Sequence, residues 1–161
     1  MDSDKTNRWL TLGANIGVLI GIMLLVFELT ENREMMRAQT RNDISRQIVD
    51  RLSMIANDSQ ASSMKRRAEA GEELSEDEEH QYFLMFVANI RDWENIHYQY
   101  RHGMFDENEF YAERTAWRFV ISNNRAFLRN WCQTRRNFSP QFAAELDGLL
   151  DKDACTTTPK E

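Results

Sequence analysis

Residues that interrupt helices are scarce in this sequence. Its 161 residues include only two proline and six glycine residues. Because glycine and proline mark turns and break helices, while Glu, Arg, Met, Gln and Ala are frequent, we predict an all-α fold. We find no credible strand and no internal repeat.

Cysteine is also scarce, since the chain has only Cys132 and Cys155. Two cysteines are too few for a disulfide framework, and Cys155 lies in a polar tail, residues 152–161. The sequence therefore predicts two free thiols.

Signatures of catalysis are missing as well. Neither cysteine belongs to a motif with an acid-base partner, and there is no glycine-rich phosphate loop. The formal net charge is −6, and all of it falls after residue 27, which argues against nonspecific nucleic-acid binding. We expect a protein that is not an enzyme, holds no cofactor and binds no nucleic acid.

One pair of residues has the spacing of a metal site. Glu94-x-x-His97 is the arrangement that di-iron carboxylate helices use, but a single pair is weak evidence. The similar pair Asp77-x-x-His80 lies seventeen residues earlier on the same predicted helix, about 25 Å away. We expect no metal, and His97 to lie in the core while bonding Glu94 or a tyrosine; a metal protein using this pair is the third alternative.

The most informative feature present is a long apolar run. Residues 9–27 are nineteen consecutive positions without a charge. As a helix they reach roughly 28 to 30 Å, which matches the hydrocarbon thickness of a bilayer. We predict a short leader over residues 1–8 and a transmembrane helix over 9–29. The run is longer than the apolar part of a signal peptide and lacks a small-x-small cleavage site.

The charges beside this span give an orientation. Lys5 and Arg8 precede it, and four arginines follow within about twenty residues. This bias places the C-terminal domain in the cytoplasm and the helix in the cell (inner) membrane.

Glycines mark one side of the span. Gly13, Gly17 and Gly21 recur every four residues, so they form one stripe along which a second helix can approach closely. We therefore predict a homo-oligomer. Asn15 lies on the opposite face and Glu28 returns to the glycine side at the membrane boundary, so a ring could collect both at a seam or pore. The alternative is that both are ordinary solvated or locally bonded residues.

After the span, no proline or glycine interrupts residues 28–70. We predict that the helix continues as a juxtamembrane rod over 30–70, with Ile44, Ile48, Leu52 and Ile55 at helical spacing. A helical bundle is expected over residues 71–151.

Helix boundaries in this bundle are strongly marked. Ser75 with Glu78 and Asp106 with Glu109 match capping boxes, and Ser139-Pro140 is a typical helix start. The first of these helices should end at Gly103.

Five arginines fall on one side of a predicted helix that bends at residues 122–124 without ending; they are Arg114, Arg118, Arg125, Arg129 and Arg136. Such a row could hold anionic lipid headgroups or an acidic partner. The alternative is that these arginines pair with the acidic run of residues 69–79, in this chain or a neighbouring one.

Three segments carry a resemblance: residues 12–21 (LGANIGVLIG) with 27–29 and Asn32, residues 94–103 (ENIHYQYRHG) with Asp106 and Glu107, and residues 138–140. They resemble a group of small bacterial single-pass membrane proteins that is uncharacterised in function. The resemblance implies a bacterial envelope protein with a glycine-rich membrane helix and a helical C-terminal domain. It implies no catalytic residues.

Together these observations predict a membrane-anchored, homo-oligomeric helical scaffold or sensor-like module without catalysis. The second alternative is a small oligomeric ion channel in which Asn15 and Glu28 face the pore.

Overall fold

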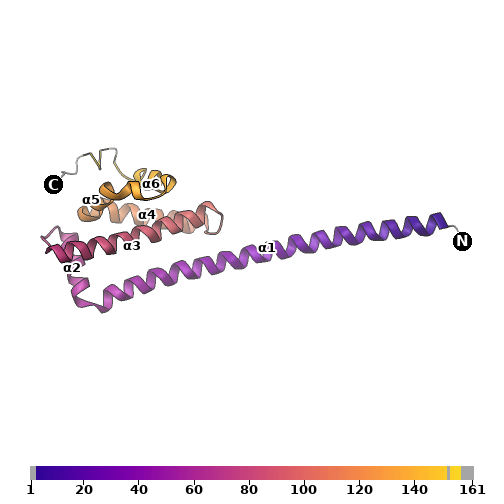
Figure 1. Ribbon diagram of the computed structural model, residues 1–161, viewed down its shortest axis with the longest axis horizontal. Coiled ribbons are helices and arrows are strands. Elements are labelled where there is room, and N and C mark those ends of the chain that lie inside the picture. The colour runs from indigo at the N-terminus through magenta and orange to yellow at the C-terminus, as the bar shows by residue number, and fades with distance from the viewer. Residues whose placement is uncertain (1–2, 152, 157–161) are drawn as a thin grey trace. The chain divides into compact units, whose positions relative to one another are not determined.

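The computed structural model describes residues 3–151 and 153–156, and within these ranges all regular structure is helical. The elements are α1 (Ser3–Asn57), α2 (Ser59–Ala70), α3 (Glu76–Arg101), α4 (Glu107–Asn123), α5 (Arg125–Thr134), the 3₁₀ turn η1 (Arg135–Asn137) and α6 (Pro140–Asp147) (Figure 1). The prediction of an all-α fold with a long apolar N-terminal helix is confirmed. The chain divides into two units, residues 1–39 and residues 40–161.

The first unit is the N-terminal part of α1. It contains a window apolar enough to cross a membrane, and none of that window is buried. Every residue from 9 to 29 is exposed. The apolar side chains of this unit therefore find no cover in the chain itself.

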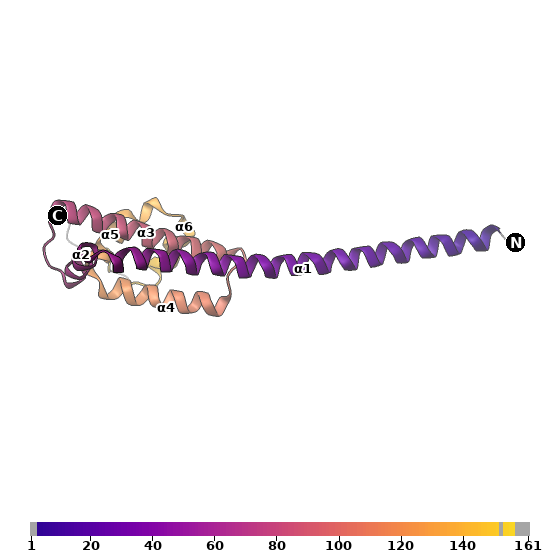
Figure 2. The same ribbon diagram turned by 90° about the horizontal axis from the view of Figure 1, so that it is seen from below.

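The second unit has its own core. Helices α3 to α6 lie side by side in both views (Figures 1 and 2), and the last part of α1 contributes Ile44 to the same core. The largest fully buried side chains include Trp117, Trp131, Phe86 and Phe142. Trp93 and Trp117 stack with ring centroids 5.3 Å apart, so aromatic packing joins α3 to α4.

Side-chain caps form as predicted at two helix starts, and at α6 the predicted proline is in place although the Ser139 side chain makes no cap hydrogen bond. Ser75 and Glu78 form a reciprocal capping box at α3. The Asp106 carboxylate accepts the N–H groups of Asn108 and Glu109 at α4, and Pro140 occupies the first turn of α6. At the end of α3, Gly103 adopts a φ of 68°, a conformation that glycine reaches without strain.

Two helix breaks differ from the prediction. The rod predicted over residues 30–70 is not continuous, because α1 ends at Asn57 and Asp58 turns the chain into α2. The Asp58 carboxylate accepts the N–H groups of Gln60 and Ala61, which caps the new helix. As a result α2 returns to α3 and α5 and buries Met64 and Ala68. The second unit also includes the end of α1 from residue 40, where Ile44 joins the core.

The second break is at Asn124. The sequence favoured one bent helix there, but α4 ends at Asn123 and α5 begins at Arg125. The Asn124 side chain accepts the N–H of Phe127 and so caps α5. A buried polar residue therefore ends one helix and starts the next.

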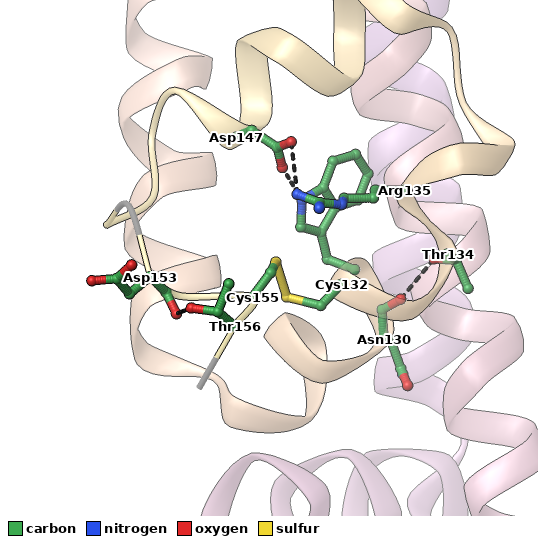
Figure 3. The surroundings of a disulfide bond; sticks show 9 residues. Asn130, Cys132, Thr134, Arg135, Asp147, Asp153, Cys155 and Thr156 are labelled. Carbon is green, nitrogen blue, oxygen red and sulfur yellow. Dashed lines mark hydrogen bonds and ion pairs between the residues drawn. A yellow bond between two sulfur atoms is a disulfide. The ribbon is translucent and has the colours of Figure 1, made fainter. Parts of the chain in front are cut away.

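The prediction of two free thiols is wrong. Cys132 and Cys155 form a disulfide that ties α5 to the C-terminal segment, as Figure 3 shows. Cys155 packs against the core instead of lying in a solvated tail. Beside it, the Asp147 carboxylate accepts the indole N–H of Trp131 at 2.9 Å and an Arg135 N–H at 3.0 Å, which fixes α6 on α5. The spacing of the two cysteines in the sequence does not by itself predict that position 155 lies next to α5.

Candidate functional site

The predicted oligomer residues lie open on α1. A methyl group added at Gly13, Gly17 or Gly21 would meet no atom within 4 Å beyond its own stretch of helix. Asn15 and Glu28 are exposed too, on an apolar helix that nothing in the described chain covers. The stripe is therefore free to meet another helix.

A groove in the second unit is the best candidate for a ligand site. It lies between the C-terminal half of α3 and the start of α6 and has a volume of about 430 Å³. The residues that line it are Arg91, Glu94, Asn95, His97, Tyr98, Arg101, His102, Ser139 and Gln141, and the exposed lining surface comes mainly from their apolar atoms. Both members of the Glu94-x-x-His97 pair thus line one groove.

Glu94 is held tightly at one end of this groove. One of its carboxylate oxygens accepts the Ser139 N–H at 2.7 Å and the other accepts an Arg91 N–H at 2.6 Å. Burial by itself would raise the pKa of Glu94, but these bonds from Ser139 and Arg91 outweigh it and lower the pKa. Glu94 is therefore ionised at neutral pH, with both oxygens engaged.

Arg91 is itself fixed by three contacts. Besides Glu94, it donates to the Asn137 carbonyl at 3.3 Å, and its guanidinium carbon lies 4.4 Å from the centroid of the Phe138 ring. The contacts with Asn137 and Phe138 join α3 to the segment between α5 and α6. Sequence analysis missed this role of Arg91, because Asn137 and Phe138 lie more than forty positions away.

His97 is buried, as predicted, but it does not bond Glu94. Only 5% of the residue is exposed, and its ring lies 6.0 Å from Phe110 and 5.8 Å from Phe142, measured between centroids. Burial lowers the pKa of His97, and the positive charge of Arg101 acts in the same direction against the carboxylates of Glu145 and Glu94. The ring is therefore neutral at pH 7.

The arrangement around Glu94 bears on the metal hypothesis. Within residues 3–151 and 153–156, no group of three or more His, Cys, Asp and Glu side chains is placed to hold a metal ion. The carboxylate oxygens that a metal would need are already bonded to Ser139 and Arg91. Glu94 is thus engaged in holding α3 to the start of α6.

The five arginines do not form one row. Arg114 and Arg118 belong to α4, Arg125 and Arg129 to α5, and Arg136 to η1, because the helix ends at Asn123. Arg114 pairs with Glu145 on α6, outside the acidic run. The other four are exposed.

A second polar cluster joins three helices. Arg51 on α1 pairs with Asp92 on α3, and both side chains are largely buried. Burial lowers the pKa of Arg51 and raises that of Glu113 on α4, while the attraction between these two charges opposes both shifts. The signal for this cluster was present, since Arg51 lies seven residues after Ile44 and so falls on the same face of the helix.

Comparison with known proteins adds no assignment to this geometry: no family model, no curated protein and no solved structure matches the chain.

Proposed function

We propose that this chain is a single-pass membrane protein of the bacterial envelope that carries a helical bundle and works as a homo-oligomeric scaffold or sensor-like module without catalysis. One observation supports the anchor above all. The apolar window of α1 is entirely unburied, so its side chains would stand in water unless lipid or a second chain covers them. A core helix of a soluble domain would be covered by its own chain.

The glycine stripe supports self-association. Between helices in lipid, close packing at small residues is one of the few available attractive forces. Gly13, Gly17 and Gly21 offer such a surface along about two turns, with no side chain of the described chain in the way. The proposed partners are other copies of the chain and the surrounding bilayer.

The disulfide changes the proposed orientation. Disulfides persist in oxidising compartments and are rare in the cytoplasm. The Cys132–Cys155 bond therefore favours a bundle outside the cytoplasm, with Lys5 and Arg8 on the cytoplasmic side. This replaces the orientation suggested by the arginines after the span, whose balance is weakened by the interleaved residues Glu28, Glu31 and Glu34.

The oligomer is tested by measuring the mass of the full chain in mild detergent by analytical ultracentrifugation. We expect Gly17→Leu to shift the protein to monomers, because the new side chain separates the helices. Leu19→Phe is the matched control, since it adds bulk about 160° away around the helix and should leave the mass unchanged. A monomeric wild type, or an oligomer that survives Gly17→Leu, would contradict the proposal.

A second candidate function, a small ion channel, is favoured by Asn15. Its amide lies within an apolar span and makes no hydrogen bond to any described residue. In a ring of subunits, Asn15 could line a lumen and Glu28 could attract cations at its mouth. Ion flux in liposomes that is lost in Asn15→Leu would support the channel. A dimer that passes no ions across a range of voltages would exclude it.

A further inference from the structure

The end of α1 that belongs to the second unit has one face that the bundle covers. On this face Ile44 is buried, and Ile48, Arg51 and Ile55 are partly buried. The sequence placed Leu52 on the same apolar stripe, but the structure leaves Leu52 55% exposed. The bundle therefore covers only one side of this part of the helix, and an apolar side chain is left uncovered.

A second face of the same helix segment is exposed throughout. Its residues recur at alternating intervals of three and four positions and are Asn42, Ser45, Val49, Leu52 and Ala56. Val49 is 58% exposed, similar to Leu52. At 100° per residue this face lies about 110° around the helix from the face that contacts the bundle. A second helix can therefore lie along it while the bundle stays in place.

The spacing is that of a heptad repeat, and the residue types indicate which partner fits. Asn42, Val49 and Ala56 occupy the a positions, and Ser45 and Leu52 occupy the d positions. A β-branched residue at a with Leu at d favours two parallel strands, and an Asn at one a position fixes register and oligomer state. Two copies that are anchored in one membrane meet with their helices parallel. The pattern therefore fits a second copy of the same helix.

The charges beside this face are complementary to those of a second copy. Arg41, at a g position, pairs with Glu109 on α4 at 2.6 Å, and the Glu109 side chain remains 34% exposed. Arg46, at an e position, is exposed and forms no ion pair with the described residues 3–151 and 153–156. In a parallel pair the g positions of one helix lie opposite the e positions of the other. Arg46 of the second copy therefore meets the carboxylate of Glu109 instead of an unpaired arginine.

The glycine stripe follows the same repeat in the sequence. Gly21 lies three heptads before the first position of the exposed face, and Gly17 lies four heptads before its second position. Gly21 is therefore an a residue and Gly17 a d residue. Charges occupy this series only at the membrane boundary, as Glu28 and Glu31. A strict seven-residue spacing allows two helices to stay in contact by left-handed supercoiling.

We propose that residues 42–56 of two copies form a parallel two-stranded coiled coil outside the membrane, with the heptad face of Asn42 to Ala56 as its seam. This inference rests on the proposed function, because it requires anchored chains that self-associate. It adds a second interface and a subunit number to that function. A pair of helices encloses no lumen, so the seam favours the scaffold over the channel.

The seam is tested by cross-linking the full chain in nanodiscs. Val49→Cys places a thiol at the centre of the seam, where two copies bring it within the roughly 4.4 to 6.8 Å between Cα atoms that a disulfide needs. Gln47→Cys is the matched control, since position 47 is also exposed but lies about 180° around the helix from the seam. After mild oxidation, we expect a covalent dimer on a nonreducing gel for Val49→Cys only. The unaltered chain, with its own disulfide, gives the background.

A second pair of variants measures the strength of the seam. Val49→Lys should raise the protein concentration at which half of the dimer dissociates by about tenfold or more, because two ammonium groups then meet inside the seam. Gln47→Lys adds the same charge on the opposite side of the helix and should leave this concentration unchanged. Analytical ultracentrifugation in mild detergent measures both, and far-UV circular dichroism verifies that the helices are intact.

The outcomes separate this inference from the proposed function. A monomeric wild type contradicts the proposed function itself. A wild-type oligomer in which Val49→Cys and Gln47→Cys cross-link equally, or in which neither cross-links, overturns the coiled coil alone. A mass of three or more copies also overturns it, because the seam joins two strands. A dimer that cross-links only through position 49 and is weakened only by Val49→Lys supports it.

Discussion

Asn124 is a single side chain that joins three helices. Its amide exchanges hydrogen bonds with the Tyr82 hydroxyl on α3, at 3.0 and 3.2 Å, and donates to Glu69 on α2 at 3.4 Å. Its oxygen also caps α5 through Phe127. Burial raises the pKa of Tyr82, so its hydroxyl stays protonated and able to donate.

Asn124→Ala should therefore be strongly destabilising. It removes a helix cap and leaves the buried Tyr82 hydroxyl unpaired, so we expect a loss of about 2 to 4 kcal/mol in the free energy of unfolding. Urea unfolding followed by tryptophan fluorescence measures it. Asn123→Ala changes the exposed neighbour, which bonds only the Phe119 carbonyl, and should cost about 0.5 kcal/mol or less. Equal effects of the two substitutions would contradict the assigned role.

His97 makes the free energy of unfolding depend on pH, and the sign of this dependence follows from the burial of the ring. The pKa of His97 is lowered in the folded state, so the unfolded chain binds more protons as the pH falls below about 6.5. His97 thus contributes stability that is present above that pH and is lost as the pH falls toward its folded pKa. Glu113 acts in the opposite direction, because burial raises its pKa and its protonation at lower pH relieves a buried charge.

The contribution of His97 is isolated by comparison with His97→Gln. We expect the free energy of unfolding of the wild type to fall more steeply between pH 7.5 and pH 5.5 than that of the variant. Urea titrations at both pH values measure the two slopes, and the variant's lower stability at each pH does not affect the comparison. Identical slopes would show that His97 titrates alike in folded and unfolded chains.

At the scale of elements, the C-terminal segment is held by a covalent bond and not by helix formation. The disulfide closes a loop with a sequence separation of 23, which contains η1 and α6. Inside this loop, Phe138, Phe142 and Leu146 are buried in the core. The disulfide and the Asp147 contacts together keep α6 on α5 and therefore keep one wall of the groove in place.

Reducing this bond should destabilise the second unit by roughly 3 kcal/mol, because the unfolded chain regains the freedom of a loop of this size. Urea unfolding with and without dithiothreitol measures the change. The double variant Cys132→Ser/Cys155→Ser should not respond to dithiothreitol, which controls for effects of the reagent. Alkylation of both cysteines in the untreated, denatured protein would show instead that they are free.

The helix starts show which helix boundaries can be predicted from neighbouring residues alone. Ser75 and Asp106 were recognisable because a cap is a contact between residues two or three positions apart, and the start of α6 was recognisable from Pro140 in its first turn. Asp58 and Asn124 carry the same chemistry, yet each lies in a sequence equally compatible with a continuous helix. What decides these two breaks is the burial of Met64 and Ala68 after one and the bond to Tyr82 at the other.

At the scale of the whole molecule, the disulfide leads to a testable prediction of which side of the membrane carries the C-terminal unit. If the C-terminal unit lies outside the cytoplasm, alkaline phosphatase fused to the C-terminus should be active in a bacterial host, and a fluorescent protein that folds only in the cytoplasm should be dark. Replacing Lys5 and Arg8 by Gln removes the positive charges before the span and should reduce phosphatase activity. A bright fluorescent fusion together with an inactive phosphatase fusion would show that the C-terminal unit lies in the cytoplasm.

The sequence by itself determined the helical class, the apolar N-terminal segment and most helix starts, because these depend on composition and on contacts within one or two turns. It also predicted the burial of His97, from its place on an apolar helix face. The tertiary structure alone decided the disulfide, the separation of the five arginines and the binding of Glu94 by Ser139. Each of these joins residues on different elements, and such pairings are fixed only when the aromatic core brings those elements together.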